Sequence, residues 1–311
     1  MSLVHTIICR NSKKTKTWYC AENRPDYGAR RADEQRRTSS ILVPKGVRIE
    51  KENCGGVPVE VITAAKNPTD RVVLYIHGGG FVGGSVETRR MFTTYIANRM
   101  EYNVAAVEYR LAPEFPFPAA PQDCLAVYRQ IVRKFAPKHI VLLGESAGGN
   151  LVLALLLQIK ASGLPMPAAA ICFSPCVQYD HVLPSYTENQ NSEAMVTNLA
   201  EEVADVYVCS HEKSRLCDPL VAPLYGDFTH CPPICLWAST SEILRDDSIF
   251  LYEKLKKEGH SCQLYLRRGM IHTWMIMPFF HEAKKDLKMI RRYIDSAMEG
   301  ILPQGCKMIR L

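Results

Sequence analysis

The sequence predicts an α/β fold in which a mainly parallel β-sheet is covered on both faces by helices. Short and almost uninterrupted apolar runs alternate with segments of helical spacing. Strands buried on both faces have this composition, and helical crossovers between them make the strands parallel. The chain has 311 residues, of which 47% are hydrophobic and 23% charged, so it can bury the core of one large domain or two ordinary ones.

Six runs are predicted as strands because each is short, apolar and rich in β-branched or aromatic residues. In chain order they are RVVLYIH (71–77), YNVAAVEY (102–109), HIVLLGE (139–145), AAAICFSP (168–175), PICLWAS (233–239) and SCQLYLR (261–267). A last helix is expected to begin near Glu282, because Leu287, Ile290 and Ile294 then share one face.

One segment, residues 182–218, does not follow this alternation and is expected to form a helical cap over one end of the sheet. It is polar at first and then helical through AEEVADVYV. We expect residues 1–45 to complete the cap, and residues 46–181 and 219–311 to form the two parts of the core.

The excess of positive charge in the chain comes from its N-terminal part. The net charge is +6, and residues 1–48 hold 11 Lys and Arg against 4 Asp and Glu. No nucleic-acid recognition motif accompanies this charge, so no nucleic-acid partner is expected. The longest apolar run, 151–159, is half the roughly 18 residues of a membrane span. Residues 3–9 lack a preceding basic region and make a poor signal peptide, so we expect a cytoplasmic protein that does not bind membranes.

The 12 cysteines are scattered and do not form a dense disulfide framework. Cys172 and Cys176, like Cys231 and Cys235, are separated by three residues, but paired histidines at zinc-site spacing are missing. Buried reduced thiols are the simpler interpretation, and no metal site is predicted.

A serine between glycines is the first candidate for catalysis. Gly144, Ser146 and Gly148 fit the G-x-S-x-G pattern, with an apolar strand before and a helical segment after. A sharp turn there would expose the Ser146 hydroxyl at the carboxyl end of the sheet. The first turn of the helix behind it would favour a developing negative charge.

The second candidate is the glycine run in YIHGGGFVGGS, where residues 77–80 follow a predicted strand. Successive glycines can bring backbone N–H groups close to a substrate carbonyl, as an oxyanion hole requires. A merely flexible loop is the alternative interpretation.

At this point the chain resembles the hormone-sensitive-lipase-like branch (bacterial family IV) of α/β-hydrolase esterases, from about residue 70 to the end. The resemblance consists of six blocks in the family's order: HGGGF at 77, YRLAPEFPFPAAPQD at 109, GESAGGN at 144, PP at 232, LRDD at 244 and GMIH at 269. It implies an α/β-hydrolase fold with a mostly parallel eight-stranded sheet, flanking helices and a helical cap.

The resemblance also implies roles for individual residues. Ser146 would be the nucleophile and His272 the general base. The oxyanion hole would use the amides of Gly79, Gly80 and Ala147, and the structural motif positions would be His77, Gly78, Gly144 and Gly148. Phe81 and Val82 would line the acyl side of the pocket.

The acidic residue is where this sequence departs from the family. An aspartate usually begins a D-P-L-R-D-type stretch thirty residues before the histidine, and here that position is Glu242, followed by Ile243. Glu242, Asp246 and Asp247 therefore compete for the role. Glu242 is favoured, because the block then aligns without a gap and glutamate can also orient an imidazole.

These residues predict a serine carboxylesterase that uses an acyl-enzyme intermediate and needs no cofactor. The resemblance implies that its substrates are short-chain acyl esters. The same residues would serve an amidase, lactonase or thioesterase. A non-catalytic receptor with a hydrolase fold is the alternative from another class of protein. The expected partner is a small ester substrate, and a homodimer is possible by resemblance.

Overall fold

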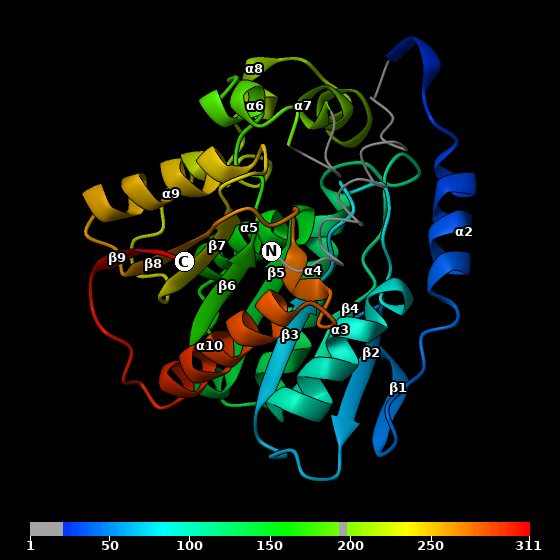
Figure 1. The fold of residues 1–311 in the computed structure, drawn as a ribbon, viewed down its shortest axis with the longest axis vertical. Coiled ribbons are helices and arrows are strands. Elements are labelled where there is room, and N and C mark those ends of the chain that lie inside the picture. Colours follow the sequence, from blue (N-terminus) through cyan, green and yellow to red (C-terminus); the bar gives the residue numbers. More distant parts are fainter. Residues whose placement is uncertain (1–20, 193–197) are drawn as a thin grey trace.

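The computed structural model describes residues 21–192 and 198–311, which form a nine-stranded sheet with helices on both faces (Figure 1). The strand order is β1-β2-β4-β3-β5-β6-β7-β8-β9. Strands β3 to β9 are parallel, whereas β2 is antiparallel to both β1 and β4. The strands are β1 (Val47–Cys54), β2 (Val57–Ala64), β3 (Val72–Ile76), β4 (Asn103–Val107), β5 (Ile140–Glu145), β6 (Ala169–Phe173), β7 (Ile234–Ser239), β8 (Cys262–Arg267) and β9 (Cys306–Arg310).

The six strands read from the sequence are β3 to β8, and each begins and ends within two residues of its predicted range. Five of them, β3 and β5 to β7 throughout and β4 beyond its first residue, are fully buried. This burial explains why they read as continuous apolar runs. The prediction of a mainly parallel sheet is confirmed.

The expected count of eight strands was wrong by one, because the described residues include β9 at the C-terminal edge of the sheet. It pairs in parallel with β8, with Cys306 opposite Cys262. Only one side of an edge strand meets a neighbour, and β9 contains no fully buried residue. A segment that is half exposed and rich in Lys and Arg carries little of the apolar signal by which strands are recognised.

At the opposite edge, β1 and β2 form a hairpin that the apolar runs also did not indicate. Its two-residue turn consists of Gly55 and Gly56, which have φ values of +68° and +91°. Two successive positive φ values suit the right-handed twist of the flanking strands, and glycine adopts them without strain.

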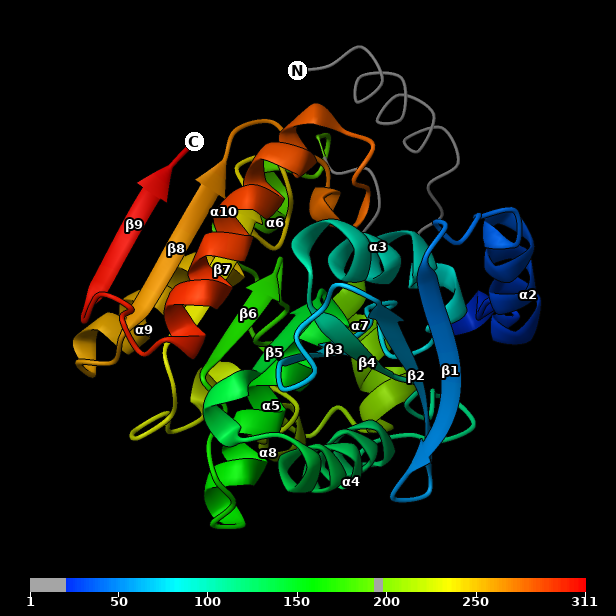
Figure 2. The same ribbon diagram turned by 90° about the horizontal axis from the view of Figure 1, so that it is seen from below.

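The helices divide into two layers with the sheet between them, as Figure 2 shows. The layer that contains α3 and α10 packs its apolar side chains on one face, and α4, α5 and α9 cover the other. The predicted last helix is α10, whose buried residues include Leu287, Ile290 and Ile294. The elements of these layers are η2 (Glu87–Arg89), α3 (Arg90–Tyr95), η3 (Ile96–Met100), α4 (Ala119–Lys134), η4 (Pro137–His139), α5 (Ala147–Ala161), η6 (Pro223–Tyr225), α9 (Arg245–Lys257), η7 (Trp274–Ile276) and α10 (His281–Met298).

Four short helices between β6 and β7 gather beyond one end of the sheet (Figure 1). They are α6 (Pro184–Glu188), α7 (Leu199–Glu202), η5 (Val203–Val208) and α8 (Lys213–Leu216). Ahead of the sheet come η1 (Ala21–Asn23) and α2 (Tyr27–Thr38), and the Tyr27 hydroxyl of α2 donates a hydrogen bond to Glu202 at 3.1 Å. The expected division into cap and core stays a prediction, and residues 1–20 and 193–197 of it lie outside the described residues.

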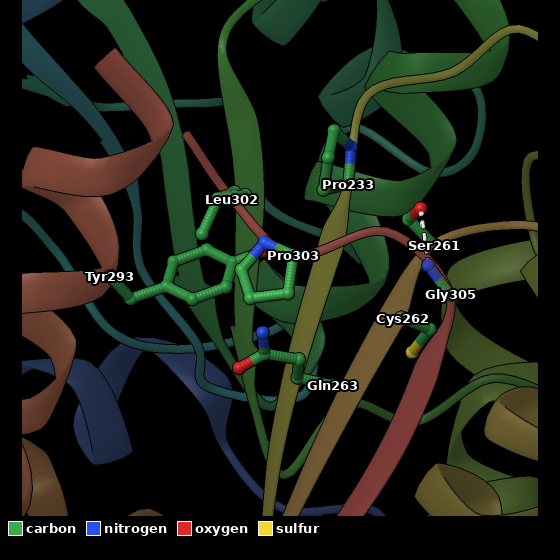
Figure 3. A pocket seen from close by; sticks show the side chains of 8 residues that line it. All are labelled: Pro233, Ser261, Cys262, Gln263, Tyr293, Leu302, Pro303 and Gly305. Carbon is green, nitrogen blue, oxygen red and sulfur yellow. Dashed lines mark hydrogen bonds between the residues drawn. The ribbon is translucent and has the colours of Figure 1, made fainter. Parts of the chain in front are cut away.

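A small hollow lies at the amino ends of β7, β8 and β9 (Figure 3). It is lined by Pro233, Ser261, Cys262, Gln263, Tyr293, Leu302, Pro303 and Gly305. The predicted site residues follow the carboxyl ends of their strands, so this hollow lies at the opposite ends of the strands from the predicted site. None of the helices in the described ranges is long and apolar enough to cross a membrane.

Candidate active site

Ser146 occupies a strained turn between β5 and α5. Its backbone has φ 55° and ψ −121°, which is unfavourable for a residue with a side chain. Its amide donates to the Phe173 carbonyl at 2.8 Å, which ties the turn to the neighbouring strand. A Cβ on Gly144 would lie 2.3 Å from the Gly148 carbonyl oxygen, and one on Gly148 would lie 2.1 Å from that of Ile76. Both glycines of the motif are therefore required by the close approach of backbone atoms.

His272 and Glu242 meet beyond the carboxyl ends of the strands. Nδ1 of His272 lies 2.6 Å from Oε2 of Glu242, and the two residues are 4% and 1% exposed. The other carboxylate oxygen, Oε1, accepts hydrogen bonds from the Ser239 amide at 2.6 Å and the Ser174 hydroxyl at 2.9 Å. The carboxylate is thus held from both sides, and its orientation fixes that of the imidazole.

The two other candidate acids are engaged elsewhere, in the first turn of α9. Asp246 accepts a hydrogen bond from the Ser185 amide at 2.8 Å and pairs with Arg245. Asp247 accepts hydrogen bonds from the Val177 amide and the Tyr186 hydroxyl, both at 2.9 Å. Burial raises the pKa of Asp247 to about 7. Of the three carboxylates that competed in the sequence, Glu242 is the one hydrogen-bonded to His272.

The glycine loop, residues 77–84, packs directly against the Ser146 turn. A Cβ on Gly78 would lie 2.5 Å from the Glu145 carbonyl oxygen and 3.0 Å from Cβ of Ser146. The loop also closes on itself, because the amides of Val82 and Gly83 both donate to the Gly79 carbonyl, at 3.2 and 2.9 Å. The chain therefore brings the backbone of the loop beside the serine, as an oxyanion hole requires.

Gly79, Gly80 and Ala147 are the residues whose amides the family resemblance implies for that hole. Gly79 and Gly80 have φ values of +131° and +65°, which glycine adopts readily. A Cβ on Gly79 would lie 2.1 Å from the Gly83 carbonyl oxygen. Ala147 is the first residue of the helix α5, whose N-terminal amides favour negative charge.

His77 lies in the core below the loop. Its ring stacks on Tyr109 at a centroid distance of 4.3 Å, and the Tyr109 hydroxyl donates to the His77 carbonyl at 2.8 Å. Nδ1 of His77 lies 2.9 Å from the Gly78 carbonyl, which can only accept, so this nitrogen carries a proton. Burial lowers the pKa of His77 to about 4, so the ring is neutral near pH 7. These contacts agree with a structural role.

Residues of the short helices beyond the sheet cover the loop. The Phe81 ring stacks on Tyr207 of η5, with centroids 3.9 Å apart. A Cβ on Gly80 would lie 3.8 Å from Cδ1 of Leu199 in α7. Both Phe81 and Val82 are buried. Space above the loop is therefore bounded by apolar side chains.

His181, which directly precedes the predicted cap insertion, and His211, which lies within it, are both largely exposed. Their side chains are 59% and 71% exposed and lie beside Asp180 and Asp205, at 3.2 and 2.6 Å.

Sequence reasoning missed the groups that hold the site in place. Ser174 and Ser239 stand at the carboxyl ends of β6 and β7, and that position was the signal that could have indicated them. It also missed the ion pairs of Arg89 with Glu145 and Glu34. Their members are 55 or more residues apart, and no local pattern connects them.

Comparison with known proteins gives a consistent result. Residues 73–276 match the sequence profile of a family described as alpha/beta hydrolase fold. An esterase of Acinetobacter venetianus is 33% identical over 252 residues, which cover 80% of this chain and 82% of that protein. An acetyl-hydrolase of Streptomyces hygroscopicus is 29% identical over 262 residues, covering 80% and 87%. The crystal structure of an esterase from the bacterial hormone-sensitive lipase family superposes with a TM-score of 0.88 at 30% identity, covering 96% of this chain and 99% of that one.

The fold, the serine turn and these matches together define an α/β-hydrolase. Within that class the chain belongs to the hormone-sensitive-lipase family of esterases, and it is a carboxylic ester hydrolase. The resemblance seen in the six sequence blocks is confirmed.

Proposed function

We propose that the protein hydrolyses short-chain acyl esters, with Ser146 as nucleophile, His272 as general base and Glu242 as the acidic residue. The observation that carries this proposal is the 2.6 Å contact between His272 Nδ1 and Glu242 Oε2. A carboxylate on Nδ1 keeps the proton there and leaves Nε2 as the atom that accepts the serine proton.

In the first half-reaction the Ser146 hydroxyl gives its proton to His272 Nε2 as its oxygen bonds to the ester carbonyl carbon. The carbonyl oxygen becomes an oxyanion, which the amides of Gly79, Gly80 and Ala147 stabilise. The intermediate then collapses, the bond to the alcohol oxygen breaks, and His272 returns its proton to that oxygen. In the second half-reaction, water loses a proton to His272 and attacks the acyl carbon. The carboxylic acid leaves, and Ser146 recovers its proton.

Three features support short acyl chains. Leu199 lies over Gly80, Tyr207 stacks on Phe81, and both Phe81 and Val82 of the loop are buried. Apolar side chains packed this closely around the loop favour a small apolar acyl group. We expect acetyl to about hexanoyl esters to be the best substrates.

The same proposal extends to organisation and location. We propose that residues 1–45 and 182–218 act as a cap over residues 46–181 and 219–311, that the protein is cytoplasmic, and that it forms a homodimer. The contact of Tyr27 in α2 with Glu202 in α7 supports a cap built from both segments.

The test is a series of p-nitrophenyl esters from acetate to palmitate, measured on the wild type, Ser146→Ala and Ser162→Ala. Ser162 is exposed at the other end of α5 and serves as the matched control. We expect activity to fall steeply beyond about eight carbons. We expect Ser146→Ala to lower kcat by about 10⁴-fold or more with an unchanged circular-dichroism spectrum, and the control to match the wild type.

An active Ser146→Ala variant would overturn the assignment of the nucleophile. Turnover of amides, lactones or thioesters far above that of esters would move the substrate to one of those classes. Ligand binding by a folded protein that cleaves none of these bonds would identify a receptor.

A further inference from the structure

Arg89 is a largely buried cation held between two carboxylates behind the glycine loop. Its side chain is 14% exposed. Nε donates to Glu145 Oε1 at 2.9 Å and Nη1 to Glu34 Oε1 at 2.8 Å, and Nη2 lies 3.4 Å from the Gly78 carbonyl oxygen. Burial acts to lower the pKa of Arg89, but the charges of the two carboxylates raise it above its usual value. The guanidinium is therefore a fixed positive charge that joins three separate segments.

The first of these segments is the serine turn. Glu145 directly precedes Ser146 and is 1% exposed. Its Oε1 accepts a hydrogen bond from the Gly78 amide at 2.7 Å, and its Oε2 accepts one from the Tyr75 hydroxyl at 2.7 Å. The carboxylate next to the nucleophile thus holds the beginning of the glycine loop.

The second segment is α2, which contacts the end of the same loop. Glu34 Oε2 accepts a hydrogen bond from the Gly84 amide at 3.1 Å. Arg31, one turn earlier on the same face of the helix, donates through Nε to the Val82 carbonyl at 2.7 Å. Burial acts to raise the pKa of Glu34, but the charge of Arg89 and the hydrogen bonds from Arg89 and Gly84 lower it overall. Glu34 is therefore ionised at neutral pH and can hold both partners.

The two ends of the loop touch each other. Gly84 has a φ of +80°, and a Cβ there would lie 2.2 Å from the Gly78 carbonyl oxygen. Between these ends, the amide of Gly83 donates to the Gly79 carbonyl. A shift of Gly84 is therefore passed directly to Gly78 and Gly79, whose backbone borders the reaction centre.

From these contacts we infer that Glu34 of α2 is a positioning residue for the oxyanion hole, acting through Arg89 and the Gly84 amide. The inference rests on the proposed function, because it assumes that the glycine loop stabilises an oxyanion. In this inference α2 contributes to catalysis indirectly. Its Glu34 connects the predicted cap, through Arg89, to Glu145, the residue that precedes the nucleophile.

Such a positioning role predicts a specific kinetic effect of removing Glu34. Oxyanion donors act only within about 2.7–3.1 Å of the developing charge, so a small displacement of the loop weakens transition-state binding. A displacement of about 1 Å can lower the rate by about 100-fold. Substrate binding to the apolar walls of the pocket does not depend on this geometry. Loss of Glu34 should therefore lower kcat and leave KM nearly unchanged.

The experiment compares Glu34→Ala and Glu34→Gln with Asp33→Ala. Asp33 is the matched control, because it is the neighbouring carboxylate and its ion pairs, with Arg36 and Arg37, stay within α2. Steady-state kinetics on p-nitrophenyl acetate are measured for each variant, together with inhibition by an alkyl trifluoromethyl ketone. Addition of the serine to this ketone produces an oxyanion, so its inhibition constant reports the hole directly.

We expect Glu34→Ala to lower kcat by about 10- to 100-fold with KM within about threefold of the wild type. The inhibition constant of the ketone should rise by a similar factor. Glu34→Gln keeps an acceptor of the same size and should recover part of the loss, and Asp33→Ala should match the wild type. If Glu34→Ala does not fold, Glu34→Gln is compared with Asp33→Asn in the same two assays.

The inference is overturned if kcat and ketone inhibition of both Glu34 variants match those of the Asp33 controls. It is also overturned if the variants lose only thermal stability, since a merely structural contact would do that. A wild type without Ser146-dependent ester hydrolysis would overturn the proposed function and this inference with it. Ser146-dependent activity that is indifferent to Glu34 would overturn the inference alone.

Discussion

The strongest test of the proposed acid is the substitution Glu242→Gln, which changes one atom of the carboxylate without changing its size. In the wild type, Oε1 accepts hydrogen bonds from the Ser239 amide at 2.6 Å and the Ser174 hydroxyl at 2.9 Å. The Ser239 amide can only donate, so the oxygen of the new carboxamide must occupy this position. Its NH₂ group is then directed at His272 Nδ1, which lies 2.6 Å from Oε2 in the wild type.

This orientation forces the imidazole into the wrong tautomer. Nδ1 must accept a hydrogen bond from the carboxamide, so the proton moves to Nε2, which can then no longer take the proton of Ser146. Turning the carboxamide over would restore the tautomer but leave the buried Ser239 amide facing an NH₂ group. That arrangement costs about 1–3 kcal/mol, so its population lies between about one in six and about one in 160. The negative charge that stabilises imidazolium is lost in either orientation.

Together these effects should lower kcat by about 10³- to 10⁴-fold, or about 4–5.5 kcal/mol of transition-state stabilisation. The assay is steady-state hydrolysis of p-nitrophenyl acetate, with thermal unfolding as the check on folding. Asp246→Asn is the control, and it should keep most of the activity because Asp246 is bound to Ser185 and Arg245. A Glu242→Gln enzyme with more than about a tenth of wild-type kcat would refute the reasoning. An equal loss in Asp246→Asn would make Asp246 the acid instead.

Two further predictions concern stability. Gly148→Ala should destabilise the fold by about 3 kcal/mol or more in urea unfolding, since its Cβ would lie 2.1 Å from the Ile76 carbonyl oxygen and neither backbone can yield. Gly163→Ala has nothing within 4 Å and only a φ of +62° to strain, so it should cost about 1 kcal/mol, and equal losses would contradict the steric argument. Burial raises the pKa of Asp247 from 3.8 to about 7, so between these pH values the native state binds a proton that the unfolded state does not. The stability that comes from this proton is complete below pH 3.8 and is lost as the pH rises through 7. The unfolding free energy of Asp247→Asn relative to the wild type should therefore rise by up to about 4 kcal/mol from pH 4 to 7, and a flat difference would show that the buried carboxyl does not titrate in this range.

Much of this protein could be predicted from the sequence, because the relevant information is local. Strands β3 to β7 lie in the interior of the sheet, and their burial leaves a nearly continuous apolar run in each case. The sharp turn at Ser146 could be predicted because such a turn leaves glycines at fixed spacing. A Cβ on Gly148 or Gly144 would lie 2.1 or 2.3 Å from a backbone oxygen, which accounts for both glycines. The edge strand β9 was missed for the opposite reason, because a partly buried strand does not need a continuous run of apolar residues.

The tertiary structure decided what depends on distant partners. Glu242, Asp246 and Asp247 lie within six residues of one another, and their side chains have the same chemistry. What separates them is the set of groups that other segments bring to each: His272 and two serines for the first, a cation and backbone amides for the others.

The same reason applies to Glu34, Arg89 and Glu145, which are isolated charges in the sequence and one partly buried network in the fold. The sequence by itself determined the fold class, the family and the serine turn, through patterns that repeat over a few residues. The selection of one carboxylate for His272, and the contact of α2 with the glycine loop, depended on the folded chain. Ion pairs and hydrogen bonds depend on the distance between groups in the folded chain, and a short stretch of sequence does not determine that distance.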